Sequence, residues 1–274
     1  MKRWLNPIWV RLKRVMWSEK YLFSMLITMI VMQAQILSKM WLRSRYVSEL
    51  YLRGAYENSF LLDLASVELL FAYSYVIVFV AIIVCGNLYC EDRNAGTYAM
   101  MRERESYATY HIRNIACIVL STIVFCLVPL LVNLLTSMAC FPTRNIMDDM
   151  YATPAYAKHI VAGQWLSFFK AFHPVAYMYM QMVMVSATCV VFTLLNYGLS
   201  VFSGMNGYVC SVASFVFYVL FTTLPLHLGN GMQKYSLQAY LNAYDYGSYG
   251  VFFFLVGIVF VMSLLLAFAR RKDI

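Results

Sequence analysis

The sequence predicts an all-α integral membrane protein with six transmembrane helices. Of its 274 residues, 62% are hydrophobic and only 12% are charged, and the mean hydropathy is +0.66. Its apolar runs are long enough to cross a hydrocarbon core about 30 Å thick. They are continuous rather than alternating, which favours helices over a barrel, because a helix satisfies its own backbone hydrogen bonds in lipid. We place the spans, within a single transmembrane domain of residues 1–274, at about 20–38, 67–89, 114–138, 174–202, 208–228 and 249–269.

The segment before the first span, 1–19, predicts an amphipathic helix that lies in the membrane interface. An apolar stripe at three- and four-residue steps is formed by Trp4, Ile8, Leu12 and Val15. Lys13 and Arg14 oppose this stripe, so apolar burial and charge would together hold the helix on an anionic inner leaflet. The alternative is a basic tail that only retains the N-terminus on one side of the membrane.

The basic residues predict the orientation of the chain. With six spans, both termini lie on the same side as the 2–3 and 4–5 loops. Thirteen Lys and Arg residues fall on that side and eight on the other. The positive-inside rule then places both termini in the cytoplasm of a multi-pass cell-membrane protein. The net charge of +8 therefore needs no nucleic-acid partner to explain it.

An unusually charged interval, 90–114, separates the second and third spans. Eight charges lie in it, namely Glu91, Asp92, Arg93, Arg102, Glu103, Arg104, Glu105 and Arg113. Gly96 predicts a turn, and the hydroxyl of Thr97 is expected to cap a short helix that follows it. Such a helix, with Met101 on one face and both signs of charge on another, suits docking to a soluble partner. The alternative is a solvated hairpin that only connects two spans.

The sequence lacks the residue patterns of several chemistries. It contains no phosphate-binding loop, no histidines at metal-ligand spacing and no hydrolase arrangement, so we expect no catalytic site, metal or cofactor in this chain. Neutral amides at membrane depth are Gln33, Gln35, Asn133, Gln181 and Asn196. They are expected to hydrogen-bond between helices or to line a pathway, with Gln33, Glu68 and Asn133 as its candidates. Glu68 is the one ionisable candidate within the predicted spans, whereas ion-coupled carriers depend on such residues.

The order Glu91-x-x-x-x-Gly96-Thr97 after the second span resembles the ABC-2 type permeases, the membrane subunits of type V-like ABC exporters. The resemblance covers the whole chain, including the basic N-terminal helix, the six spans and the charged loop. It implies that the loop forms a coupling helix that docks into a cytoplasmic ATPase. The coupling residues would be Glu91, Gly96, Thr97, Met101, Arg102, Glu103, Arg104 and Glu105. The sequence departs from the family pattern after this helix, where Ser106 has no accompanying proline and Arg113 stands in place of a lysine.

The same resemblance implies a function. Two permeases, identical or related, would flank a pathway and couple ATP hydrolysis by separate ATPase subunits, which bind ATP and Mg²⁺, to export of a peptide, drug or lipid-linked molecule. Short helices at the outer mouth would form a candidate exit gate, with Tyr235, Tyr240, Tyr244 and Asp245. Aromatic anchoring at the membrane surface explains these tyrosines equally well. The alternative functions are an ion-coupled secondary transporter or channel and an intramembrane enzyme or scaffold.

Overall fold

The computed structural model describes residues 2–46, 67–141, 174–228, 232, 235–237, 240 and 249–269. Within these residues the secondary structure is helical and contains no strand. The helices are α1 (Lys2–Met16), α2 (Glu19–Tyr46), α4 (Val67–Cys85), α5 (Leu88–Asn94), α6 (Thr97–Arg104), α7 (Tyr107–Cys140), α10 (Pro174–Ser203), α11 (Gly207–His227) and α13 (Tyr249–Ala269). The all-helical fold class is confirmed.

Across the described residues, six segments are long and apolar enough to cross a membrane, as predicted. They are Glu19–Ser38, Tyr73–Asn94, Tyr107–Cys140, Val175–Ser203, Gly207–His227 and Gly250–Ala269. The helices around the charged interval extend farther than the sequence predicted. The second segment continues through α5 to Asn94, and α7 begins at Tyr107 rather than near 114. The apolar pattern underestimated both because their polar ends are stabilised by partners elsewhere in the chain.

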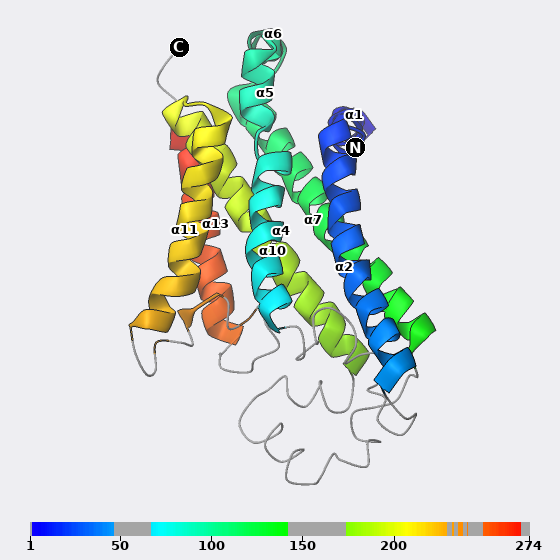
Figure 1. Cartoon of the computed structure of the whole chain (residues 1–274). Helices are drawn as coiled ribbons and strands as arrows, with labels where there is room; N and C mark the ends of the chain where they lie inside the picture. Colours follow the sequence, from blue (N-terminus) through cyan, green and yellow to red (C-terminus); the bar gives the residue numbers. More distant parts are fainter. Residues whose placement is uncertain are drawn as a thin grey trace.

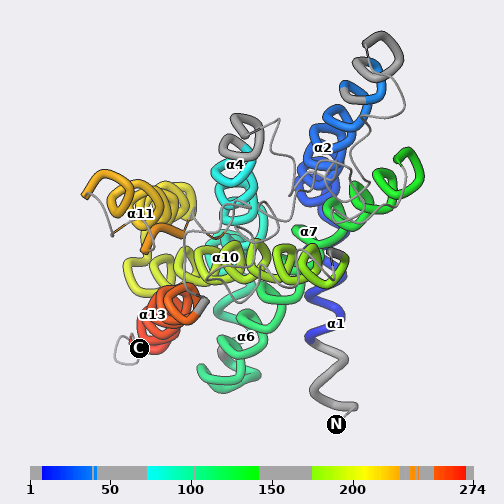
Figure 2. The backbone as a smooth tube through the Cα atoms, turned by 90° about the horizontal axis from the view of Figure 1, so that it is seen from below, coloured from blue at the N-terminus to red at the C-terminus, as the bar shows by residue number. Residues whose placement is uncertain are grey.

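Helix α10 occupies the centre of the bundle. It packs against α13, α7, α11 and α4, and Figure 2 shows it running between them. In the apolar segment of α10, 78% of the residues are buried, whereas the corresponding share is 22% in α2 and in α13. The outer faces of these peripheral helices carry exposed apolar side chains, as Phe23 and Leu265 illustrate. Such apolar outer faces are compatible with helices that cross a membrane, where no polar outer face is needed.

Helix α1 is separated from α2 by a sharp elbow. The hydroxyl of Ser18 donates to the carbonyl of Val15 at 2.7 Å, and its oxygen accepts from the backbone N–H of Tyr21 at 3.4 Å. These bonds end one helix and begin the next. Figures 1 and 2 together show α1 lying across the ends of the spanning helices rather than along them. Leu12 and Val15 are buried against the bundle, so the predicted apolar stripe faces protein at these positions.

The charged interval folds into a helical hairpin at the same end of the molecule as α1. Helix α5 nearly continues α4, the chain turns at Gly96, and α6 leads through Ser106 into α7. In Figure 1, α5 and α6 extend beyond the ends of α1, α10 and α11. Beneath them lies an apolar cluster that includes Tyr89, Tyr110 and Tyr197, onto which Tyr98 of α6 packs.

Candidate functional site

Buried hydrogen bonds among the side chains of Asn87, Asn196 and Ser211 fix the connection between α4 and α5. The side-chain amide of Asn196 donates to the carbonyl of Ile82 and to Oδ1 of Asn87, both at 3.2 Å. Ser211 donates to the same Asn87 oxygen at 3.3 Å. A Cβ atom on Gly86 would lie 2.5 Å from the Asn196 amide nitrogen, so only glycine allows this close approach. These contacts join α4 and α5 to α10 and α11.

Replacing Asn196 by leucine is expected to destabilise the protein by about 0.6–1.7 kcal/mol, which runs from the average to the largest value measured for a hydrogen bond between membrane helices. The substitution removes the bonds of the Asn196 amide to Ile82, Asn87 and Ser211, and it leaves Asn87 with Ser211 as its partner. Unfolding in mixed micelles with increasing dodecyl sulfate measures the change. Thr193→Val is the control, since the Thr193 hydroxyl bonds only within its own helix, to Cys189. An equal loss in both variants would contradict the assignment.

The turn between α5 and α6 is made by Gly96, whose φ of +70° is a left-handed value that other residues rarely adopt. Gly96 itself occupies the N-cap position of α6 and offers no side-chain bond. The predicted capping role of Thr97 is therefore wrong. Thr97 is already the first residue of the helix, and its hydroxyl points back to α5, donating to the backbone carbonyl of Asp92 at 3.1 Å.

Asp92, on α5, is the centre of a buried ionic cluster. Its side chain is 8% exposed and accepts hydrogen bonds at 2.9 Å from Arg11 Nη2 and from the Tyr110 hydroxyl. Arg11 also donates to Oδ1 of Asn114 and stacks over the Tyr110 ring, 4.8 Å from its centroid. We call Arg11, Asp92, Tyr110 and Asn114 the Asp92 cluster. It joins α1, α5 and α7, and Thr97 adds α6.

The cluster continues into the centre of the bundle. The amide nitrogen of Asn114 donates to the Tyr197 hydroxyl at 3.2 Å, and this hydroxyl shares a 2.6 Å hydrogen bond with Nδ1 of His111. Tyr197 belongs to the central helix α10, and both it and His111 are fully buried. A buried hydrogen-bond network of this kind fixes the relative positions of the helices that contribute to it.

Other charges of the interval also have partners within the chain. Glu91 pairs with Lys20 of α2, and Glu105 with Arg113 of α7. Arg93 donates to the carbonyls of Gly204 and Met205 in the connection between α10 and α11. These contacts attach the α5–α6 hairpin to elements on both sides of it.

The outer face of α6 carries the residues that do not face the bundle. Met100 is 66% exposed, and Glu103 and Arg104 are exposed as well. The opposite face packs inward, with the Tyr98 ring 5.2 Å from the ring of Tyr89 between centroids. Of the predicted coupling residues, Met101 contacts Arg11 and the side chain of Arg102 lies outside the described residues.

The predicted gate and pathway residues are only partly described. Tyr235 is 37% exposed, whereas Tyr240 is buried with its ring 5.4 Å from that of Phe252 on α13. Tyr244, Asp245 and the side chain of Glu68 lie outside the described residues. Asn133 donates to the carbonyl of Met32 at 3.0 Å and so links α7 to α2, as expected for an amide between helices. Gln33 is half-buried.

Sequence reasoning did not single out Arg11, Tyr110 or Asn114, and it named Asp92 only as one charge among eight. One signal for them was available. Tyr110 and Asn114 are four residues apart at the start of α7, so both occupy the same face of that helix. Arg11 directly precedes the buried Leu12 on α1 and gave no such pattern.

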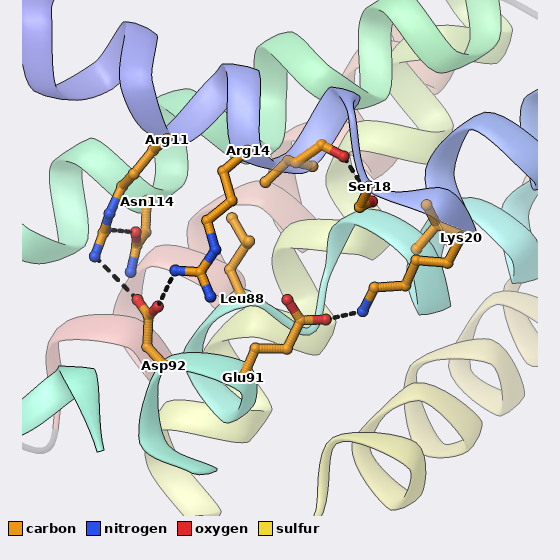
Figure 3. A pocket seen from close by; sticks show the side chains of 10 residues that line it. Arg11, Arg14, Ser18, Lys20, Leu88, Glu91, Asp92 and Asn114 are labelled. Carbon is orange, nitrogen blue, oxygen red and sulfur yellow. Dashed lines mark hydrogen bonds and ion pairs between the residues drawn. The ribbon is translucent and has the colours of Figure 1, made fainter. Parts of the chain in front are cut away.

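A pocket of about 230 Å³ opens beside the Asp92 cluster, beneath the α1–α2 elbow (Figure 3). Its walls are formed by Arg11, Arg14, Val15, Ser18, Lys20, Val84, Leu88, Glu91, Asp92 and Asn114. The charged side chains point toward one another across it in Figure 3. In the described part of the chain, no group of three or more His, Cys, Asp or Glu side chains could hold a metal ion. The chemistry of the pocket is that of ion pairing.

The site is therefore a helical hairpin whose outward face is exposed and whose inward face contacts α1, α7 and α10. Its function has to be inferred from these residues. Comparison of the chain with protein-family models, with curated proteins and with solved structures gave no match.

Proposed function

We propose that this chain is the membrane-spanning permease subunit of an ATP-driven exporter of the ABC-2 type. The observation that supports this proposal most directly is the α5–Gly96–α6 hairpin, which extends beyond the neighbouring helices and presents Met100, Glu103 and Arg104 outward. An exposed apolar side chain next to charges of both signs suits a protein partner, because apolar contact gives affinity and charge gives specificity. The partner would be a cytoplasmic ATPase, and both termini of this chain would be cytoplasmic.

The contacts of the hairpin suggest how motion would be transmitted. A force on α6 would reach α1 and α7 through the Asp92 cluster, α2 through Glu91 and Lys20, and the α10–α11 connection through Arg93. These are short contacts on several helices, so the hairpin would move them as a unit rather than bend alone. The chain would catalyse no reaction itself, and ATP and Mg²⁺ would bind to the ATPase.

The residues at membrane depth support an external energy source. Away from the end of the bundle that carries α5 and α6, the polar side chains buried in the described spans are neutral amides and hydroxyls, such as Asn133, Gln181 and Thr188. Carriers driven by ion gradients use ionisable side chains there. A second permease, identical or related, would complete the pathway for an amphipathic substrate.

Reversing the charges on the outer face of α6 tests the proposal. The double variant Glu103→Lys/Arg104→Glu is expected to weaken ATPase binding at least tenfold, about 1.4 kcal/mol, because like charges would then face each other across the interface. Its thermal stability in detergent should match that of the parent, since both side chains are exposed. Copurification of the ATPase from the native membrane and ATP-driven transport in vesicles are the two measurements.

Glu19→Lys is the matched control, because Glu19 is an exposed carboxylate at the same end of the molecule but lies on α2. This control should bind the ATPase normally. If no ATPase associates with the parent chain, or if transport persists without ATP and follows an ion gradient, the exporter proposal fails in favour of the ion-coupled alternative.

A further inference from the structure

The pocket beneath the α1–α2 elbow has the charge and position of a binding site for a lipid headgroup. We propose that it binds the phosphate of an anionic phospholipid from the leaflet on the side of α1. This inference rests on the geometry of the pocket alone and does not depend on the proposed transport function.

The charges around the pocket leave one cation in excess. Lys20 pairs with Glu91, and Arg11 pairs with Asp92 at 2.9 Å. The third cation, Arg14, makes a longer ion pair with Asp92, at 3.7 Å and beyond ordinary hydrogen-bonding distance, and its side chain is 61% exposed. Two carboxylates against three cations leave a single positive charge, which a phosphodiester with its single negative charge would neutralise. Arginine is well suited to this role, because its planar donors match phosphate oxygens.

The surroundings of the pocket favour a lipid over a free anion. Trp17, at the elbow, is 72% exposed, and Trp9, about two turns earlier on α1, is 65% exposed; tryptophan is enriched at the level of lipid headgroups. Phe23, one turn after the start of α2 at Glu19, is 65% exposed and begins the apolar surface that acyl chains would cover. Val15, Val84 and Leu88 supply apolar wall within the pocket itself. An ion-binding site for a small free anion would have no use for these apolar surfaces.

The volume fits such an occupant. At about 230 Å³ the pocket is far larger than the roughly 30 Å³ share of one water molecule, so it has room for a phosphate and part of the attached glycerol. Arg14 and Lys20 both line the pocket (Figure 3), and their side chains are more than half exposed. A headgroup could therefore enter from the membrane surface without displacing a helix.

Opposite charge changes should shift lipid affinity in opposite directions. The purified full chain in a neutral detergent is titrated with dioleoyl phosphatidylglycerol, and binding is measured by native mass spectrometry. Arg14→Gln should weaken binding about fivefold, because it removes a direct hydrogen bond from the guanidinium to the phosphate, which contributes about 1 kcal/mol. Glu91→Gln should strengthen binding by a similar factor, since it removes a negative charge from the pocket wall. A gain in affinity cannot arise from misfolding.

Lys13→Gln is the matched control. Lys13 is an exposed cation next to Arg14 on the same helix but does not line the pocket, and its removal should leave the affinity unchanged. Zwitterionic phosphatidylcholine should bind at least fivefold more weakly than phosphatidylglycerol. An equal loss in Lys13→Gln and Arg14→Gln would overturn the proposal by showing diffuse surface attraction. Equal occupancy by inorganic phosphate or glycerol-3-phosphate at the same concentration would overturn the lipid assignment.

Discussion

Replacing Asp92 by alanine is expected to lower the free energy of unfolding by about 3–5 kcal/mol, the usual cost of removing one partner from a buried ion pair. The side chains of Asp92 and Arg11 are only 8% and 14% exposed, so the guanidinium would stay in the interior without its carboxylate. The Tyr110 hydroxyl would lose its acceptor as well. The loss should be seen as unfolding at a lower dodecyl sulfate fraction in mixed micelles.

Glu91→Ala is the control for this experiment. Glu91 is the preceding residue on α5, but its pair with Lys20 is partly exposed, with side-chain exposures of 36% and 52%. Solvent screens such pairs, and they contribute about 0–1 kcal/mol. If Asp92→Ala costs no more than Glu91→Ala, the Asp92 cluster does not hold α1 and α7 to the hairpin.

A double variant separates the cost of leaving the Arg11 guanidinium unpaired from the other consequences of losing the Asp92 side chain. Arg11→Met/Asp92→Asn removes both charges while leaving an oxygen at position 92 that can accept from Tyr110. Because replacing a whole buried ion pair by neutral groups is often close to neutral in stability, this double variant should recover most of the loss. If it is instead as unstable as Asp92→Ala, the cost does not come from the stranded guanidinium.

Much of the fold could be predicted from the sequence because a membrane imposes a simple rule. Every spanning segment must be helical and about 20 residues long, so apolar length alone located all six. Gly96 as a turn was also predictable, since its left-handed conformation has a known residue preference. The central position of α10 was not, because its hydropathy resembles that of α2 and α11 although its burial is much greater.

The candidate site was less predictable because its residues come together only in the folded chain. Arg11 and Asp92 are 81 positions apart in sequence, and nothing in the pattern of either segment pairs them. Charge density drew attention to the whole interval, but it could not distinguish Glu103 and Arg104, which face outward, from Glu105, which pairs with Arg113. The direction in which α6 faces depends on Tyr98 packing against Tyr89 and Tyr110, a tertiary contact.

Gly198→Ala, which adds one methyl group, is expected to destabilise the protein by about 1–3 kcal/mol through overpacking. Gly198 lies on α10 where it packs against α13, the most extensive helix contact among the described residues. A Cβ atom there would lie 2.7 Å from the carbonyl oxygen of Ser263 and 3.1 Å from Cβ of Leu266. The nearer atom belongs to the backbone of α13 and cannot rotate away, so the two helices would have to separate.

The same substitution at Gly257 should have the opposite effect or none. Gly257 lies on α13, and a Cβ atom there would meet nothing within 4 Å. Exchanging glycine for alanine inside a helix otherwise gains up to about 1 kcal/mol of helix propensity. Gly198→Ala must overcome that gain to be destabilising, so comparing the two variants by unfolding in mixed micelles isolates the cost of helix contact. Equal stability changes at both positions would mean that α10 and α13 are not in close contact at Gly198, and that the centre of the bundle is looser than the structure indicates.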